Sequence, residues 1–207
     1  MRGRFITLEG GEGVGKSTQL RQLAAAIRTR GHDVMETREP GGSPGAEAIR
    51  TLLLTGAVDR WDVRTEALLF AAARADHVAR AILPALDGGQ WVLCDRFIDS
   101  SIAYQGVAGE LGTEAIRRLH AVGSNDLYPD RTLLLTLDAD AAANRTAARD
   151  GATADRIGGR GGTFHRQVAE AFEALAQSEP ARFRVIDASG TAEEVTDRLI
   201  AEIEDLL

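Results

Sequence analysis

A glycine-rich segment near the start of the sequence carries residue types that can bind a polyphosphate. Residues 10–17 read GGEGVGKS and fit the P-loop pattern G-x-x-x-x-G-K-[ST]. The glycines let backbone N–H groups converge on anionic oxygens, and the helix expected to follow adds partial positive charge. Lys16 is expected to reach the β- and γ-phosphates of ATP, and Ser17 is expected to bind Mg²⁺. The predicted ATP-binding residues are Gly10, Gly11, Glu12, Gly13, Val14, Gly15, Lys16, Ser17 and Thr18.

Lysine occurs only in this segment, since Lys16 is the single lysine among the 24 Lys and Arg residues. An ammonium group is a compact point charge, whereas a guanidinium group is a broad planar fork. A narrow phosphate slot that admits only the ammonium explains the exception, and chance placement is the alternative. We therefore expect Lys16 to be catalytic. A nucleotide-binding module without transfer chemistry would carry the same loop.

A second group of polar residues follows the apolar run WVLCD at residues 91–95. A strand that is buried on both faces reads as a continuous apolar run, and a carboxylate at its end resembles the Walker B residue of a metal site. Asp95 is therefore expected to bind Mg²⁺ together with Ser17. Arg96 suits an enzyme that binds a second anionic substrate beside the metal. The alternatives are a turn residue for Asp95 and a surface ion pair for Arg96.

Apolar runs and helical patterns alternate along the whole chain. This alternation predicts an α/β fold with a parallel sheet and helices on both faces. We expect one domain over residues 1–207, with the Gly- and Arg-rich segment at about 145–162 as a mobile lid. The segment EPGGSPG, residues 39–45, is predicted to be a break. The expected strands are 4–9, 33–37, 91–95, 131–137 and 183–187, and the expected helices are 16–30, 61–83 (interrupted near Pro84), 113–122, 139–149, 163–177 and 191–206.

The bulk properties exclude several classes of protein. The 207 residues are 44% apolar, which is enough for one full core. A net charge of -7 argues against a nucleic-acid partner, because such proteins need a basic face. No apolar run reaches the length of a membrane span, and the N-terminus lacks a signal-peptide pattern. Cys94 is the only cysteine, so a reducing, cytoplasmic compartment is expected.

Five segments together make the chain similar to the thymidylate kinase family. They are FITLEGGEGVGKST at 5–18, TREPGGS at 37–43, ALLFAAARADHV at 67–78, DRFIDSSIAYQG at 95–106 and DRI at 155–157. Their order and spacing match those of the family. The resemblance implies a P-loop kinase fold with a five-stranded parallel sheet, Mg²⁺-ATP as the phosphoryl donor, dTMP as the acceptor, and a homodimer.

The resemblance also assigns roles around the acceptor. Phe70 and Arg74 are four residues apart, so they share one helix face; the ring would stack on the base, and the guanidinium would donate to a base carbonyl. Tyr104 would pack against the deoxyribose, and Glu12 would accept from its 3′-hydroxyl. Arg38 and Arg96 would bind the acceptor phosphate. The full predicted substrate-binding set is Glu12, Arg38, Pro40, Phe70, Arg74, Arg96, Ser100, Ser101, Tyr104 and Gln105.

The lid segment supplies candidate cations for the migrating phosphoryl group. Phosphoryl transfer requires positive charge on that group and exclusion of water. By motif, Arg149 and Arg156 are predicted to be catalytic, together with Lys16 and Arg96. Arg145 and Arg160 are further candidates, and a solvated arginine loop is the alternative. Gly158 stands where many relatives have Glu, so the family's pairing within the lid is not carried over to this chain.

Two other functions compete with a dTMP kinase. One is a kinase for another nucleoside monophosphate, which only the preferred acceptor distinguishes. The other is a P-loop NTPase that is not a kinase. A GTPase would carry an N-K-x-D guanine motif, and a chain whose only lysine is Lys16 contains none. No general base is expected, because the acceptor oxygen is already anionic and needs alignment rather than deprotonation.

Overall fold

A five-stranded parallel sheet forms the centre of the molecule. The computed structural model describes residues 2–150 and 155–207, with backbone alone for residues 139 and 146–150. The strands have the order β2-β3-β1-β4-β5, and every neighbouring pair is parallel. This arrangement confirms the predicted fold class. The strands are β1 (Phe5–Glu9), β2 (Val34–Arg38), β3 (Trp91–Asp95), β4 (Arg131–Thr136) and β5 (Phe183–Asp187).

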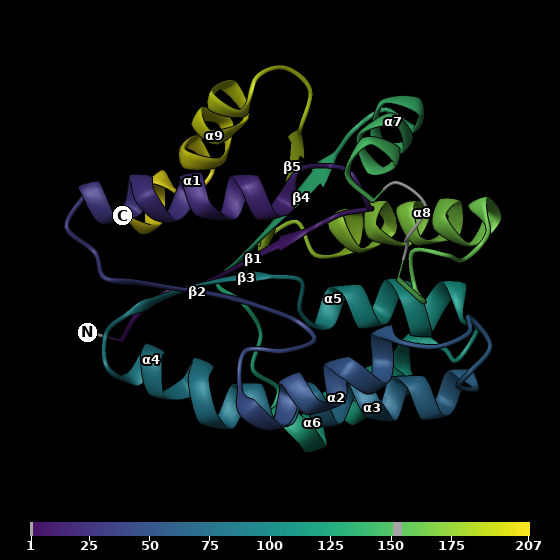
Figure 1. Cartoon of the computed structure of the whole chain (residues 1–207). Coiled ribbons are helices and arrows are strands. Elements are labelled where there is room, and N and C mark those ends of the chain that lie inside the picture. The colour runs from purple at the N-terminus through teal and green to yellow at the C-terminus, as the bar shows by residue number, and fades with distance from the viewer. Residues whose placement is uncertain (1, 151–154) are drawn as a thin grey trace.

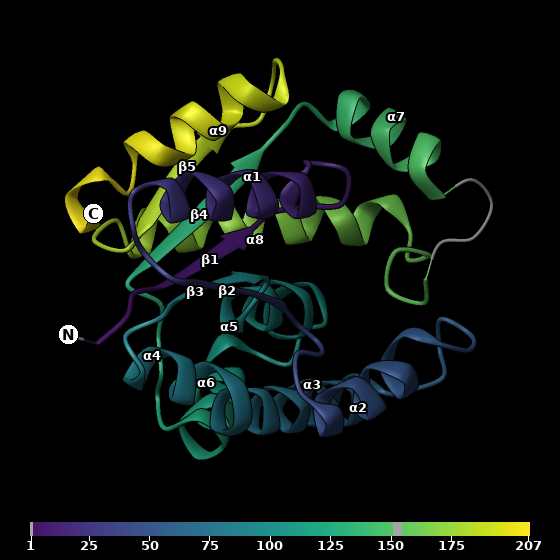
Figure 2. The same cartoon turned by 60° about the vertical axis from the view of Figure 1, so that its left-hand side comes forward.

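Helices connect the strands and cover both faces of the sheet (Figures 1 and 2). Two helices continue as wider π-helical turns, at Val78–Ile82 and Ile102–Ala108, and a 3₁₀ turn lies at Glu204–Leu206. The α-helices are α1 (Lys16–Thr29), α2 (Pro44–Leu54), α3 (Val63–His77), α4 (Leu83–Asp87), α5 (Ile98–Ser101), α6 (Thr113–Ser124), α7 (Ala139–Asp150), α8 (Gly162–Ser178) and α9 (Ala192–Ala201).

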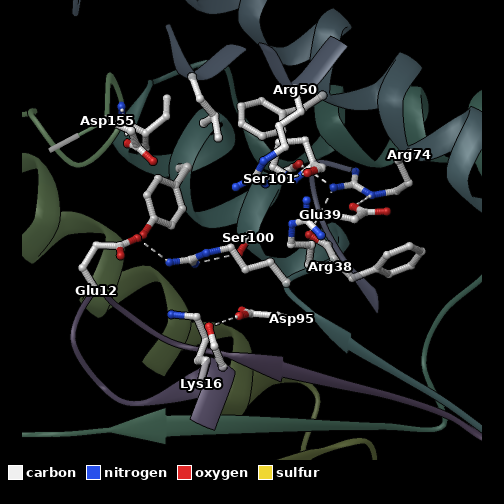
Figure 3. A pocket seen from close by; sticks show the side chains of 18 of the residues that line it. Glu12, Lys16, Arg38, Glu39, Arg50, Arg74, Asp95, Ser100, Ser101 and Asp155 are labelled. Atoms are coloured by element: carbon white, nitrogen blue, oxygen red, sulfur yellow. Dashed lines mark hydrogen bonds and ion pairs between the residues drawn. The ribbon is translucent and has the colours of Figure 1, made fainter. Parts of the chain in front are cut away.

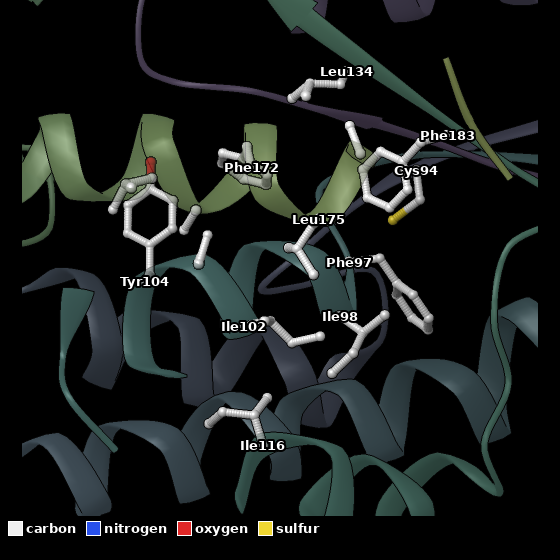
Figure 4. Close-up of a cluster of buried hydrophobic side chains, with 14 of the residues drawn as sticks. Cys94, Phe97, Ile98, Ile102, Tyr104, Ile116, Leu134, Phe172, Leu175 and Phe183 are labelled. Atoms are coloured by element: carbon white, nitrogen blue, oxygen red, sulfur yellow. The ribbon is translucent and has the colours of Figure 1, made fainter. Parts of the chain in front are cut away.

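Each face of the sheet builds its own apolar core. Successive strand residues point to opposite faces, so Phe5 packs into one core and Ile6 into the other. Helices α1 and α9 close the core on the Ile6 side. On the Phe5 side, α8 and the turns after β3 pack between the sheet and the outer helices α3 and α6 (Figure 4). The labelled side chains in that core include Phe97, Ile98, Ile102, Phe172 and Leu175.

Helix α2 was not predicted. It begins directly after the expected break, where Ser43 accepts a hydrogen bond from the Ala46 N–H and Pro44 occupies the first turn. Proline is tolerated there because the first-turn N–H groups lack intrahelical partners in any case. Ser-Pro followed by an apolar helical pattern is a helix-start signal. This helix start was missed because the surrounding glycines indicate a break in the chain.

The long helix after residue 61 also extends further than predicted. We expected an interruption near Pro84, but the chain stays helical to Asp87. A π-helical turn precedes the proline, and within it the Leu83 N–H bonds to the Val78 carbonyl. A wide turn in this position accommodates the missing N–H of proline without ending the helix. The consequence is one nearly continuous rod that carries Phe70 and Arg74 in its first half.

Candidate active site

A cavity of about 490 Å³ opens at the carboxyl ends of β1 and β3 (Figure 3). The P-loop forms one wall of the cavity, helices α2 and α3 form another, and the turns after β3 form the floor. The segment around Asp155 and Ile157 reaches its rim. In open parallel sheets, ligands bind at the carboxyl ends of the strands. The predicted nucleotide and acceptor residues therefore meet in one chamber.

The P-loop adopts its turn because its glycines take conformations that other residues avoid. Gly10, Gly13 and Gly15 have positive φ angles of 134°, 74° and 96°. A side chain at Gly10 would also come within 2.4 Å of the Leu135 carbonyl oxygen. Lys16 follows, and its Nζ donates to the carbonyls of Gly10 (3.1 Å) and Gly11 (2.6 Å). The carbonyls at the start of the loop therefore hold the Lys16 ammonium group in the ligand-free protein.

Burial of Lys16 changes its proton affinity. The side chain is only slightly exposed. Burial, followed by the nearby Arg96 cation, lowers the pKa of Lys16 to about 8. Asp95, Glu12 and Glu9 oppose this shift. The lysine is therefore held where a phosphate anion would restore its charge.

Ser17 and Asp95 lie together on the P-loop side of the cavity. The Ser17 hydroxyl donates to Asp95 Oδ2 over 2.9 Å (Figure 3). The other carboxylate oxygen, Oδ1, is buried and has no hydrogen-bond partner among the described residues. An orphaned carboxylate oxygen beside a hydroxyl fits a hard cation such as Mg²⁺. The described residues hold no cluster of three or more His, Cys, Asp or Glu, so phosphate oxygens and waters would supply the remaining ligands.

Arg96 lies between the P-loop and the acceptor side. Its guanidinium donates to Glu12 Oε1 (2.7 Å), the Gly10 carbonyl (3.0 Å) and the Ser100 hydroxyl (3.1 Å). Its backbone is left-handed, with φ of 69°, which is uncommon for a residue other than glycine. Such strain is typical of functional positions. Arg96 is thus held at the junction of the two predicted anion sites.

A buried carboxylate beneath Arg96 fixes this strained turn. Glu9 accepts hydrogen bonds from the Phe97 N–H (2.8 Å) and the Ser100 hydroxyl (2.6 Å). Burial and then the neighbouring Asp99 raise the pKa of Glu9 to about 7, and Arg96 opposes them. Glu9 was not predicted. Its position at the last residue of β1, directly before the P-loop, was the available signal.

Arg74 faces the acceptor side and is almost completely buried. Its Nε donates to Glu39 Oε2 (2.7 Å), and its Nη2 donates to the Phe97 carbonyl (3.1 Å) and the Ser101 hydroxyl (2.8 Å). This burial excludes a solvated surface position for Arg74. Glu39 also contacts His77 Nδ1 at 3.2 Å. Half-buried Phe70 lines the cavity one helical turn before Arg74.

Two further arginines lie on the acceptor side. Arg38 is exposed and pairs with Glu47 at 3.0 Å. Arg50 on α2 donates to the Pro40 carbonyl (2.6 Å), and it lines the cavity with Arg38. Burial, and then Arg38, lower the pKa of Arg50. Arg50 was missed because it belongs to the unpredicted helix α2.

Tyr104 and Gln105 complete the floor of the cavity. The Tyr104 ring lies 5.2 Å from the Arg96 guanidinium carbon. Its hydroxyl is buried without a hydrogen-bond partner among the described residues. Gln105 is almost completely buried, and its Nε2 donates to Glu66 Oε1 over 2.8 Å. An orphaned hydroxyl in a cavity wall indicates a ligand contact.

Gly10, Gly11, Val14 and Arg156 do not line the cavity, and the side chain of Arg149 lies outside the described residues. Val14 packs into the core beneath α1. Arg149 lies on α7, and its side chain is outside the described residues. Arg156 is buried: Nε donates to the Leu53 carbonyl (2.6 Å), Nη1 to the Val58 carbonyl (3.1 Å), and Nη2 pairs with Glu66. The structure therefore does not bring Arg156 to the phosphate side.

The other predicted residues converge. All the predicted substrate-binding residues line the cavity, as does the phosphate end of the P-loop. Arg145 also lines it and donates to the Ala188 carbonyl over 3.4 Å. The lining residues that the sequence did not single out include Glu39, Arg50, Leu54, Phe97, Asp155 and Ile157.

Known proteins resemble this chain over nearly its whole length. The thymidylate kinase family model matches residues 8–199. A thymidylate kinase from Rhizorhabdus wittichii is 64% identical over 207 residues, covering both chains fully. One from a Bradyrhizobium species is 48% identical over 196 residues, covering 94% of this chain and 87% of its own. The crystal structure of thymidylate kinase from Ehrlichia chaffeensis superposes with a TM-score of 0.80 at 30% identity, covering 98% of this chain and all of the other. The chain therefore belongs to the thymidylate kinase family.

Proposed function

We propose that the protein transfers the γ-phosphate of Mg²⁺-bound ATP to dTMP and releases dTDP and ADP. Thymidylate kinase activity follows from the family membership. The residue roles, the metal and the assembly are the parts proposed here. The observation that carries them is that Lys16 of the P-loop, Arg96, Phe70 and Arg74 line the same cavity.

The donor binds along the P-loop. Backbone N–H groups of residues 13–18 and the N-terminus of α1 surround the phosphates. Lys16 exchanges the carbonyls of Gly10 and Gly11 for phosphate oxygens. Ser17 and Asp95 would hold Mg²⁺, which when bound neutralises charge on the β- and γ-phosphates. The orphaned Asp95 Oδ1 supports this assignment.

The acceptor binds on the opposite side of Arg96. The ring of Phe70 stacks on the base, and Arg74 donates to a base carbonyl. Arg96 and Arg38 bind the acceptor phosphate, and Tyr104 packs against the sugar. The acceptor oxygen carries its own negative charge, so these contacts align it for attack and no base is required.

The lid supplies the last cation and excludes water. We assign this role to Arg149 because it lies four residues after Arg145, which lines the cavity. Residues four apart share one helix face. Arg156 would have to leave two carbonyls and Glu66 to take part, which counts against Arg156 in this role.

The assembly and location are also proposals. We propose one catalytic domain over residues 1–207, a cytoplasmic enzyme and a homodimer. No helix among the described residues is long and apolar enough to cross a membrane. The exposed apolar side chains of Leu68 (56% exposed) on α3 and Val122 (87%) on the adjoining α6 give a second chain an apolar surface to pack against.

A panel of nucleoside monophosphates tests the function directly. ADP release should depend on dTMP, and it should be far slower with dCMP, dGMP or dAMP. Phe70→Ala should raise KM for dTMP by about tenfold or more, through lost stacking, and leave KM for ATP nearly unchanged. Preference for another monophosphate would overturn the assigned acceptor. Equal effects on both KM values would discredit the stacking role alone.

A further inference from the structure

Glu66 lies fully buried beside the acceptor cavity, and both of its carboxylate oxygens are used. Oε1 accepts from Gln105 Nε2 at 2.8 Å, and Oε2 pairs with Arg160 at 2.6 Å and with Arg156. It lies on α3, one turn before Phe70. A buried carboxylate requires such compensation. Glu66 therefore joins the lid arginines to a residue of the cavity floor.

This contact fixes which way the Gln105 amide points. A side-chain amide has a donor side and an acceptor side, and its orientation follows from its partners. A carboxylate that is paired with Arg156 and Arg160 can only accept hydrogen bonds. Gln105 must therefore turn its NH₂ group toward Glu66 and its carbonyl oxygen away. No described residue donates to that oxygen, and Gln105 lines the cavity.

Arg74 is held so that it presents a hydrogen-bond donor to the cavity, whereas Gln105 presents an acceptor. Its Nε and Nη2 are engaged by Glu39, the Phe97 carbonyl and Ser101. Its Nη1 has no assigned acceptor among the described residues, so it remains as a donor at the cavity wall. The wall then offers a donor from Arg74 and an acceptor from Gln105. That pair complements a base with a ring N–H next to a carbonyl, and it opposes the inverted edge of cytosine.

We propose that Glu66, paired with Arg156 and Arg160, is a positioning residue that determines base specificity through the orientation of Gln105. The proposal rests on the dTMP kinase function given above. Glu66 does not touch the base. It makes the inverted amide orientation costly, because that orientation would place a carbonyl oxygen against a carboxylate.

The test uses two substrates that differ only at the edge in question. dTMP and 5-methyl-dCMP share the sugar, phosphate and 5-methyl group, but their N3 and C4 positions have inverted hydrogen-bonding character. In Glu66→Gln the neutral amide at 66 can donate or accept, so Gln105 can take either orientation. We expect the ratio of kcat/KM for dTMP over 5-methyl-dCMP to fall by about tenfold or more. A merely structural role would lower both values in proportion.

Arg160→Gln is the matched control. It removes one lid contact from Glu66, and Arg156 still pairs with the carboxylate, so the substrate ratio should stay at the wild-type value. If Glu66→Gln fails to fold because Arg156 is left buried without its partner, E66Q/R156Q removes both charges. It should show the same lowered ratio, whereas Arg156→Gln alone should not.

The outcomes distinguish the positioning role of Glu66 from the dTMP kinase function. An unchanged ratio in a folded variant that lacks the Glu66 charge overturns the positioning role and leaves the kinase function intact. A wild-type enzyme that does not phosphorylate dTMP overturns the proposed function itself. A lowered ratio in Arg160→Gln would also contradict the proposal, because that variant keeps the carboxylate.

Discussion

The Ser17 hydroxyl donates a 2.9 Å hydrogen bond to Asp95 Oδ2 and so joins the first turn of α1 to the carboxyl end of β3. The two residues are 78 positions apart in the chain. Asp95 is the last residue of β3, Ser17 follows β1 through the P-loop, and β1 and β3 are neighbours in the parallel sheet. Adjacent parallel strands end at the same edge, which is why two separate motifs share one site.

This pairing predicts the effect of Asp95→Asn. An amide keeps the size of the carboxylate and a hydrogen bond to Ser17, but it loses the charge that would attract Mg²⁺. We expect kcat to fall on the order of 100-fold and the Mg²⁺ requirement to shift to higher concentrations. Initial rates over a Mg²⁺ series measure both. Asp87→Asn, at an exposed aspartate before β3, should match the wild type, and a wild-type Mg²⁺ profile for Asp95→Asn would remove Asp95 from the metal site.

The lowered pKa of Lys16 leads us to expect proton uptake when ATP binds. Burial lowers its pKa to about 8 in the ligand-free protein, so the amine is mostly neutral at about pH 9. A bound triphosphate favours the charged form, and each ATP should therefore bring about one proton with it at that pH. ATP affinity should fall as pH rises above 8. Calorimetry in buffers of different ionisation enthalpy measures the uptake.

Lys16→Met separates this effect from other titrating groups. It should abolish transfer, leave the folded protein at least as stable as wild type at neutral pH because a buried charge is removed, and remove the proton uptake. In the wild type, the unfolded chain binds more protons than the ligand-free folded protein between pH 8 and the ordinary lysine value of 10.5. Stability from this group should thus rise with pH in that window. Proton uptake that persists in Lys16→Met would assign it to another residue.

Replacing Glu9 by Gln should give a variant that is more stable but less active. Its pKa is raised from 4.5 to about 7, so the folded protein binds the extra proton between these values. The contribution of Glu9 to stability therefore falls as pH rises from 4.5 through 7. Glu9→Gln avoids the buried charge and should raise the free energy of unfolding at pH 8 by a few kcal/mol, at about 1.4 kcal/mol per pKa unit. At pH 5 the gain should shrink.

The same variant should reduce kcat/KM, because Glu9 holds the Phe97 N–H and Ser100 that shape the strained turn at Arg96. Urea denaturation at both pH values and steady-state kinetics measure the two effects. Glu173→Gln, at an exposed position on α8, serves as the control and should show neither. A Glu9→Gln protein that is no more stable at pH 8 than at pH 5, relative to wild type, would contradict the buried-charge argument.

The sheet and the phosphate loop were predictable because their signals are local. Continuous apolar runs located the strands β3 and β4, and the P-loop pattern located Lys16 and Ser17 without any contact information. No local sequence pattern indicates which distant residue a charged side chain will pair with. Nothing in the spacing of Arg156 and Glu66 indicates that the arginine turns to α3 rather than to the phosphates. Burial decides it, because Glu66 has to be compensated within the fold.

The acceptor side was predictable only in part. Residues four apart on one helix face gave Phe70 and Arg74, whereas Arg50 required knowledge of α2 and Glu39 required knowledge of how the residue after β2 packs against α3. Glu39 is the carboxylate that orients Arg74, and Arg50 reaches the cavity from a helix that starts within a Gly- and Pro-rich stretch. Such supporting residues are chosen by tertiary packing, and local propensity does not reveal them.

Tyr104 predicts opposite effects on stability and recognition. Burial raises the pKa of its hydroxyl, which therefore stays protonated as a donor, and no described residue accepts from it. Tyr104→Phe removes an unsatisfied buried group, so the ligand-free protein should be as stable as wild type or more stable by about 1 kcal/mol. The KM for dTMP should nevertheless rise, and the KM for ATP should not. Thermal unfolding with and without dTMP measures both effects.

Tyr104→Ala tests the ring itself. The ring packs 5.2 Å from the Arg96 guanidinium carbon, beside the proposed sugar position. Its removal should admit a 2′-hydroxyl and lower the preference for dTMP over ribothymidine monophosphate, which differs only by that group. Tyr104→Phe keeps the ring and the Arg96 contact, so it should retain more of the preference than Tyr104→Ala does. Equal preference in wild type and both variants would show that the sugar is selected elsewhere in the cavity.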